Sequence, residues 1–126
     1  MMKAEVKRKT EKEEYWFREG CFITEIANDE GDSVVSIARA RVRPGSTTAW
    51  HILDGVVERY IIVTGSGKVE VGEGVPEIVE AGDVVRIPEN TRQRITNSGD
   101  DDLIFYAVCS PPFSSECYVS LEEKGE

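Results

Sequence analysis

The chain contains one histidine, His51, and a glutamate, Glu58, follows it on what reads as a strand. An imidazole binds divalent metals through a ring nitrogen, and it also exchanges a proton near neutral pH. A nearby carboxylate supports both kinds of chemistry, as a second ligand or as a charge that stabilises the protonated ring. A solitary histidine in a β-protein also serves structure alone, held by one hydrogen bond. The pair therefore leaves three interpretations open: a metal site, a proton-transfer site, or neither.

The composition predicts a single soluble domain. The chain has 126 residues, 31% of them charged, and a formal net charge of -9. This charge repels phosphate backbones and anionic lipid surfaces, so we expect neither nucleic acid nor a membrane as partner. The N-terminus lacks the apolar region of a secretory signal, and no apolar run approaches the ~20 residues that span a bilayer. Three cysteines without C-x-x-C pairing indicate reduced thiols and a cytoplasmic protein.

The distribution of apolar residues predicts an all-β, antiparallel domain. Residues 1–14 are almost entirely polar, and we expect a flexible segment there, followed by one domain over residues 15–126. Short runs rich in Val, Ile, Phe and Tyr alternate with Gly, Pro, Asp and Asn, and helical periodicity is absent. The expected strands are 21–26, 34–43, 59–63, 68–71, 84–87, 92–96, 103–109 and a short edge strand at 117–121.

Two motifs resemble those of the cupin superfamily, whose members are small double-stranded β-helix barrels of the jelly-roll type. The first cupin motif is Gly, five residues, His-x-His, three or four residues, Glu, six residues and Gly. Here that motif reads Gly45, His51, Leu53, Glu58 and Gly65 with the spacing intact. The resemblance implies a small single-domain cupin that stands alone, and such cupins are commonly homodimers.

The second cupin motif is Gly, five residues, Pro-x-Gly, two residues, His, three residues and Asn. Here it reads Gly82, Pro88, Asn90, Gln93 and Asn97. Asparagine tolerates the left-handed backbone that glycine usually adopts, so we expect Asn90 to have a positive φ.

The resemblance implies a divalent metal inside the barrel, but the ligand set is depleted. Two of the family's four ligand positions match, His51 and Glu58; Gln93 offers an amide oxygen at the third, and Leu53 offers nothing at the fourth. The implied metal ligands are therefore His51, Glu58 and Gln93, for Mn, Fe, Ni, Co or Zn. A two-histidine, one-carboxylate iron triad cannot form within a subunit that has one histidine, which counts against an oxygen-activating dioxygenase.

Strand alternation predicts which other side chains line the barrel interior. If Glu58 points inward, Tyr60 does too, because side chains alternate with period two. On strand 103–109, parity leaves two choices open: Tyr106 with Val108, or Phe105 with Cys109.

The alternation in "ARARVR" has two interpretations. We expect Arg39 and Arg41 to face solvent. If either faced inward, the pocket would suit a carboxylate or a phosphate.

Three functional hypotheses follow, and whether the protein is an enzyme stays open. The first is a cupin that binds a divalent metal, a small polar metabolite or both, with isomerase- or lyase-type chemistry and an unknown substrate. The second is a metal-free acid/base enzyme similar to the sugar-epimerase cupins, in which His51 abstracts a proton, Glu58 orients it and Tyr60 donates one. The third is a non-catalytic module that binds or senses a small-molecule ligand.

Overall fold

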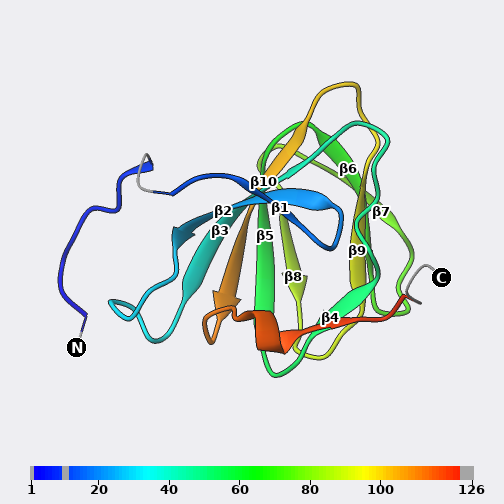
Figure 1. The fold of residues 1–126 in the computed structure, drawn as a ribbon. Coiled ribbons are helices and arrows are strands. Elements are labelled where there is room, and N and C mark those ends of the chain that lie inside the picture. Colours follow the sequence, from blue (N-terminus) through cyan, green and yellow to red (C-terminus); the bar gives the residue numbers. More distant parts are fainter. Residues whose placement is uncertain (1, 10–11, 123–126) are drawn as a thin grey trace.

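The computed structural model describes residues 2–9 and 12–122. Residues 1, 10 and 11 of the expected N-terminal segment, and residues 123–126 of the expected barrel domain, lie outside the described residues. The described chain folds into two antiparallel sheets that face each other (Figure 1), which confirms the all-β prediction. The described part contains no helix long and apolar enough to cross a membrane.

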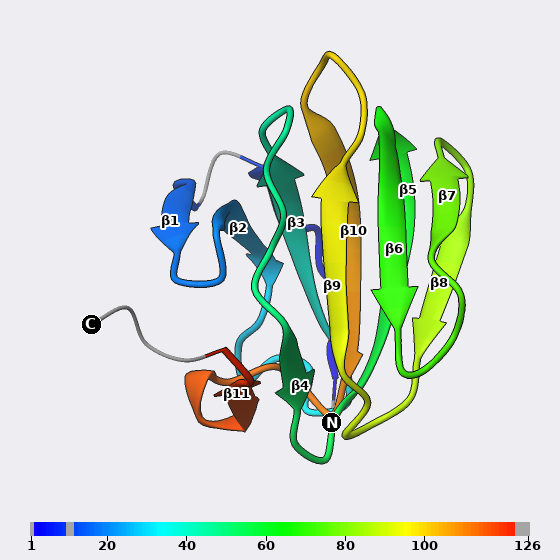
Figure 2. The same ribbon diagram turned by 90° about the vertical axis from the view of Figure 1, so that its right-hand side faces the viewer.

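Each sheet combines strands that are distant in sequence, as Figure 2 shows. The six-stranded sheet has the order β1 (Tyr15–Phe17), β2 (Cys21–Ala27), β3 (Ser36–Val42), β10 (Leu103–Ser110), β5 (Val57–Thr64) and β8 (Val84–Ile87). The five-stranded sheet has the order β11 (Tyr118–Ser120), β4 (His51–Leu53), β9 (Gln93–Asn97), β6 (Ser66–Val71) and β7 (Glu77–Glu80). A short 3-10 turn, η2 (Ser115–Cys117), leads into β11.

The expected strands are confirmed, with shifted ends, but the sequence reading missed β1, β4 and β7. These are short strands of three or four residues, too short to show alternation. β4 is fixed by remote partners, because His51 pairs with Ser120 on β11 and with Gln93 on β9. β11 lies at the edge of its sheet, as predicted.

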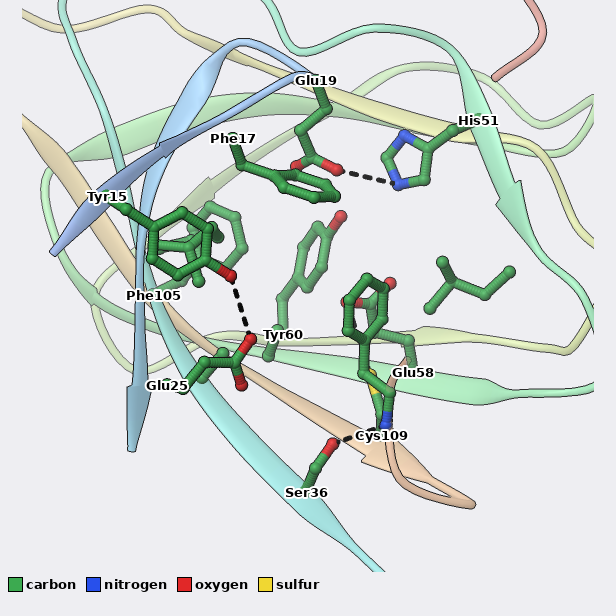
Figure 3. Close-up of a pocket in the computed structure, with 16 residues that line it drawn as sticks. Tyr15, Phe17, Glu19, Glu25, Ser36, His51, Glu58, Tyr60, Phe105 and Cys109 are labelled. Atoms are coloured by element: carbon green, nitrogen blue, oxygen red, sulfur yellow. Dashed lines mark hydrogen bonds and ion pairs between the residues drawn. The ribbon is translucent and has the colours of Figure 1, made fainter. Parts of the chain in front are cut away.

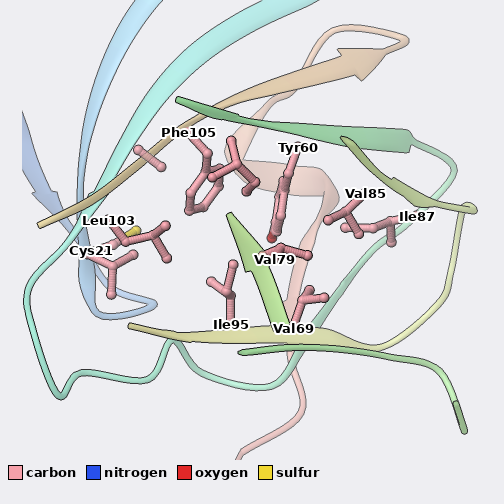
Figure 4. Packing of buried hydrophobic residues seen from close by; sticks show 12 residues of the cluster. Cys21, Tyr60, Val69, Val79, Val85, Ile87, Ile95, Leu103 and Phe105 are labelled. Carbon is pink, nitrogen blue, oxygen red and sulfur yellow. The ribbon is translucent and has the colours of Figure 1, made fainter. Parts of the chain in front are cut away.

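The core lies between the two sheets and follows the period of two (Figure 4). On β5, Glu58, Tyr60 and Ile62 are buried, whereas the residues between them are exposed. Burying one large apolar side chain of this kind contributes roughly 1.5–3 kcal/mol. The largest fully buried apolar side chains are Phe105, Ile62, Ile87, Ile95 and Leu103.

The two motif loops are joined through Asn90. Its φ of 58° confirms the expected left-handed backbone. The Asn90 N–H donates to the carbonyl of Leu53 at 3.1 Å, and its Oδ1 accepts from the N–H of Gly55 at 2.9 Å. The loop that ends β4 is therefore held against the loop that precedes β9.

The structure settles both questions that parity left open. Phe105 and Cys109 face the interior, whereas Arg39 and Arg41 lie on the outer face. Arg41 is paired there with Glu14 at 2.8 Å. The expectation that these arginines face solvent is thus confirmed, and neither of them contributes to the barrel interior.

Candidate functional site

A cavity of about 50 Å³ lies inside the barrel, between the six-stranded sheet and β4 (Figure 3). Among the predicted site residues, His51, Glu58 and Tyr60 line it. Gln93 does not line it but contacts Tyr60 from β9. The remaining wall is mostly apolar and aromatic, with two further carboxylates, Glu19 and Glu25.

His51 is held in one orientation at the start of β4. Its Nδ1 lies 2.7 Å from the carbonyl oxygen of Ala49, and a carbonyl only accepts, so Nδ1 carries the hydrogen. The ring also stacks on Tyr118, with the centroids 4.8 Å apart. Nε2 is therefore the chemically available nitrogen, and it lies 3.5 Å from Oε1 of Glu19.

Glu19 is a site residue that the sequence analysis missed. It lies in the tight turn between β1 and β2, where Gly20 has a φ of +102° and its N–H donates to Phe17. The Glu19 carbonyl accepts from the N–H of Ala49 at 2.8 Å, and the carbonyl of the same Ala49 accepts from the His51 ring. The backbone of Ala49 therefore anchors both Glu19 and His51. The thiol of Cys21 donates to Oε2 at 3.3 Å. The sequence signal was weak, since Glu19 lies outside both motifs and precedes a glycine in an ordinary turn.

Glu58 is a buried carboxyl group on β5, with 7% of the residue exposed. The thiol of Cys109 lies 3.8 Å from Oε2, and Oε1 has no hydrogen bond to any residue that the structure describes. Burial raises the pKa of Glu58 from 4.5 to about 8, and the nearby charge of Glu19 adds to the rise, whereas Gln93 and Cys109 oppose it. The Gln93 amide thus lies near this carboxyl group, but it does not reach Oε1 with hydrogen-bonding geometry.

Tyr60 and Gln93 form a buried polar pair. The Tyr60 hydroxyl donates to Oε1 of Gln93 in a short hydrogen bond. Burial, followed by the charge of Glu58, raises the pKa of this phenol well above its ordinary value of 10. Gln93 lies directly opposite His51 across the β4–β9 pair, so the phenol is linked to the histidine strand through one amide.

The predicted metal ligands do not form a ready metal centre. The Gln93 oxygen accepts from Tyr60, and Nε2 of His51 faces Glu19, which leaves Oε1 of Glu58 as the one predicted ligand oxygen without a partner. Within residues 2–9 and 12–122, no three side chains of the types His, Cys, Asp or Glu gather where they could hold a metal ion. As arranged, the donors do not fit a metal.

Comparison with known proteins identifies the family. The sequence profile of the cupin domain matches residues 38–109, which is more than half of the chain. The chain belongs to the cupin family. The matched segment of the cupin runs from β3 through β10 and contains His51, Glu58, Tyr60 and Gln93.

The cupin is similar in sequence or in structure to several known proteins, whose names describe different functions. The oxalate-binding protein of Thermotoga maritima is 38% identical over 72 residues, which are 56% of this chain and 58% of that protein. The match thus spans less than two thirds of that relative.

Two solved structures extend the similarity over most of the fold. A predicted oxalate decarboxylase of T. maritima is 27% identical, with a TM-score of 0.73 over 85% of this chain and 99% of that one. The Streptomyces protein Pac13, solved with uridine, has a TM-score of 0.79 at 18% identity, over 96% of this chain and 93% of that one. The second similarity concerns the fold alone.

Proposed function

We propose that this cupin binds a small polar metabolite in the barrel cavity and exchanges protons with it through His51 and Glu58. One observation carries the proposal. Glu58 is buried without a lysine or arginine partner among the described residues, and its free Oε1 belongs to the same cavity as His51. A buried polar group without a partner costs about 1–3 kcal/mol. Such an arrangement persists where a ligand supplies the missing contact.

The two groups are suited to opposite halves of a proton transfer. With the hydrogen on Nδ1, the neutral His51 ring offers a lone pair at Nε2 and takes a proton there. The Glu19 carboxylate at 3.5 Å then stabilises the positive ring. Glu58, whose pKa is about 8, carries a proton at neutral pH and can give it up.

Together these steps support isomerase- or lyase-type chemistry. A C–H bond of the ligand breaks and its proton goes to Nε2 of His51. The electron pair moves toward a neighbouring carbonyl, whose oxygen takes the proton of Glu58. No net charge is created in the cavity, because the proton that enters at one residue leaves at the other.

Tyr60 is placed to position these groups rather than to donate the proton. Its hydroxyl is engaged by Gln93 and its pKa is raised by burial, so the phenol is a poor acid at neutral pH. We therefore assign the donor role that the sequence suggested for Tyr60 to Glu58, and give Tyr60 and Gln93 the task of fixing the cavity wall.

The experiment is a ligand screen followed by an exchange assay. Small sugars, keto acids, amides and oxalate are tested by thermal shift, and the ligands that bind are incubated with the protein in D2O. We expect loss of a ligand C–H signal by proton NMR, abolished in His51→Gln and Glu58→Gln. The exposed Glu89→Gln, outside the cavity, should exchange normally. Exchange that persists in both cavity variants would refute the roles, and binding without exchange would show the non-catalytic binding module.

A metal is the second candidate, favoured by the same free oxygen of Glu58. Occupancy by Mn, Fe, Ni, Co or Zn with His51, Glu58 and Gln93 as ligands would require Gln93 to release the Tyr60 hydroxyl. Metal content per chain, measured on protein without a histidine tag, decides between the two candidates. Close to one equivalent, lost in Gln93→Ala, would establish the metal.

The predicted assembly is a cytoplasmic homodimer, and β1, β8, β11 and β7, which lie at the edges of the two sheets, are the strands available for pairing. Sedimentation equilibrium tests this prediction, and a mass of about 14.0 kDa would refute it.

A further inference from the structure

We infer that Ser36 is a second hydrogen-bond donor to the carbonyl oxygen of the ligand, so that its hydroxyl and the carboxyl group of Glu58 together hold this oxygen. The inference rests on the proposed function, because it adds a residue to the same proton transfer. It depends on three features of the structure: the free hydrogen of Ser36, the engagement of the other hydroxyl groups of the cavity, and the place of Ser36 in the same row of the sheet as Glu58.

Ser36, on β3, has the one hydroxyl group of the cavity whose hydrogen has no acceptor in the described part of the chain. The lining side chains with hydroxyl groups are Tyr15, Ser36 and Tyr60. The hydroxyls of Tyr15 and Tyr60 donate to a glutamate and a glutamine of the protein. Ser36 instead accepts from the N–H of Phe113 at 2.9 Å, and none of the described residues accepts a hydrogen bond from it.

This free hydrogen is buried. Only 3% of Ser36 is exposed, so bulk water does not replace the missing acceptor. A serine hydroxyl has one hydrogen and two lone pairs, and the bond from Phe113 uses a lone pair alone. A buried hydrogen without an acceptor costs about 1–3 kcal/mol. A ligand that brings an acceptor oxygen into the cavity removes this cost.

Ser36 and Glu58 lie on the two sides of Cys109 on the inner face of the six-stranded sheet. Cys109, on β10, pairs directly with Ser36 on β3 and with Glu58 on β5. Neighbouring strands are about 4.8 Å apart, so the backbones of Ser36 and Glu58 are roughly 10 Å apart. All three residues line the cavity (Figure 3). A ligand oxygen that lies over Cys109 therefore has Ser36 on one side and Glu58 on the other.

The oxygen of Glu58 that is available to carry its proton is Oε1. Oε2 is the oxygen that the Cys109 thiol approaches as a donor, at 3.8 Å, whereas Oε1 has no partner among the described residues. A protonated carboxyl group has one O–H donor, and on Oε1 this donor is free. A carbonyl oxygen has two lone pairs, so it accepts from Ser36 and from Glu58 at the same time.

The two donors stabilise the carbonyl oxygen while negative charge develops on it. As the C–H bond of the ligand breaks, its proton goes to His51 and the electron pair moves toward this oxygen. Glu58 transfers its proton to the oxygen, whereas Ser36 keeps its hydrogen and only donates a hydrogen bond. Donors that are fixed around a developing charge change reaction rates by about a hundredfold or more. Ser36 should therefore affect the rate of exchange more than the affinity for the ligand.

The test uses acetone labelled with 13C at the carbonyl carbon, a small neutral carbonyl compound. Its binding, its carbonyl shift and the exchange of its methyl hydrogens in D2O are followed by NMR. We expect a downfield carbonyl shift on binding, because hydrogen bonds to the oxygen withdraw electrons from the carbon. Ser36→Ala should reduce this shift and slow exchange at saturating acetone at least about tenfold. It should weaken binding less than about fivefold, the effect of one neutral hydrogen bond.

Two further variants keep the position polar. Ser36→Thr retains the hydroxyl and should retain the carbonyl shift and most of the exchange. Ser36→Cys has nearly the same size but a weak donor, and its exchange should lie between those of wild type and Ser36→Ala. The dispersion of each variant's amide spectrum shows whether it is folded, and the cysteine variant decides if the alanine variant is not. Exchange at the wild-type rate in Ser36→Cys and a wild-type carbonyl shift would then overturn the inference.

A control separates this role from a structural one, since Ser36→Ala also removes the acceptor of the Phe113 N–H. Asn28 does not line the cavity, but its amide donates to the carbonyl of Phe113 at 2.9 Å and to Glu25 at 3.4 Å. Asn28→Ala therefore loosens the same segment and leaves the Ser36 hydroxyl in place. It should keep the wild-type carbonyl shift and exchange rate. If it lowers both as much as Ser36→Ala does, the effect is structural and the inference is overturned.

The remaining outcomes separate this inference from the proposed function. Wild-type exchange and carbonyl shift in Ser36→Ala, with exchange abolished in His51→Gln, would overturn the role of Ser36 and leave the proposed function intact. If acetone does not bind, the same variants are compared with the compound of the ligand screen whose C–H exchanges, and an unchanged rate in Ser36→Ala overturns the role. If no compound exchanges in the wild type, the proposed function fails and the role of Ser36 fails with it.

Discussion

The buried carboxyl group of Glu58 should make the protein less stable as the pH rises, and Glu58→Gln should remove that dependence. The folded-state pKa of Glu58 is raised from 4.5 to about 8. The folded protein therefore keeps a proton that the unfolded chain releases. The contribution of protonated Glu58 to the free energy of unfolding is complete below pH 4.5, declines between pH 4.5 and 8, and is lost above pH 8.

The magnitude follows from the two pKa values. Each tenfold change in an acid constant corresponds to roughly 1.4 kcal/mol, so ionising the buried carboxyl group costs about 5 kcal/mol in full. At pH 7 the loss of stability is about 3 kcal/mol, because Glu58 is still protonated in most of the folded molecules. Glutamine has the same shape and does not titrate. The variant should therefore gain stability over the wild type as the pH rises, by up to about 5 kcal/mol above pH 8.

Urea unfolding at several pH values from 5 to 9, followed by far-UV circular dichroism and tryptophan fluorescence, measures this difference. The control is Glu89→Gln, which removes a carboxyl group from an exposed position and should show a flat difference. A flat difference for Glu58→Gln between pH 5 and 8 would refute the reasoning, since it would mean that Glu58 ionises at its ordinary pKa in the folded protein.

Three further predictions concern single contacts and are checked by the melting temperature, in which 1 kcal/mol corresponds to roughly 3–5 °C for a domain of this size. Gly65→Ala should destabilise by about 2 kcal/mol, because φ is +89° and the new Cβ would lie 2.8 Å from the carbonyl oxygen of Asp102. An unchanged melting temperature would contradict that contact. Asn97→Ala should cost about 3 kcal/mol, since its buried amide donates to two backbone carbonyls at 2.8 Å each; a loss of under about 1 kcal/mol would show that water replaces it. Tyr60→Phe should cost about 1 kcal/mol by removing the hydroxyl from Gln93 while keeping the ring, and should leave ligand C–H exchange measurable. Complete loss of exchange would instead return the donor role to Tyr60.

The motif spacing by itself determines the barrel. Gly45 to Asn97 match two cupin motifs, and the apolar runs beside them predict most of the strands. Alternation along a strand also predicted correctly that Glu58, Tyr60 and Ile62 share the inner face, because the period of two is a local property of the backbone. The same local rule could not choose between Tyr106 and Phe105. Alternation tells which residues of a strand share a face, but it does not tell which of the two faces points into the barrel.

The tertiary structure decided which groups meet. Glu19 reaches His51 only because the β1–β2 turn is anchored on the backbone of Ala49, a contact between segments about thirty residues apart. The free oxygen of Glu58 and the hydrogen bond between Tyr60 and Gln93 depend in the same way on three strands from different parts of the chain. The sequence alone determined that His51 and Glu58 belong to one barrel. The packing of the sheets determined that the histidine faces another carboxylate and that the glutamate is buried without a charged partner among residues 2–9 and 12–122, because burial and distance arise only when remote strands come together.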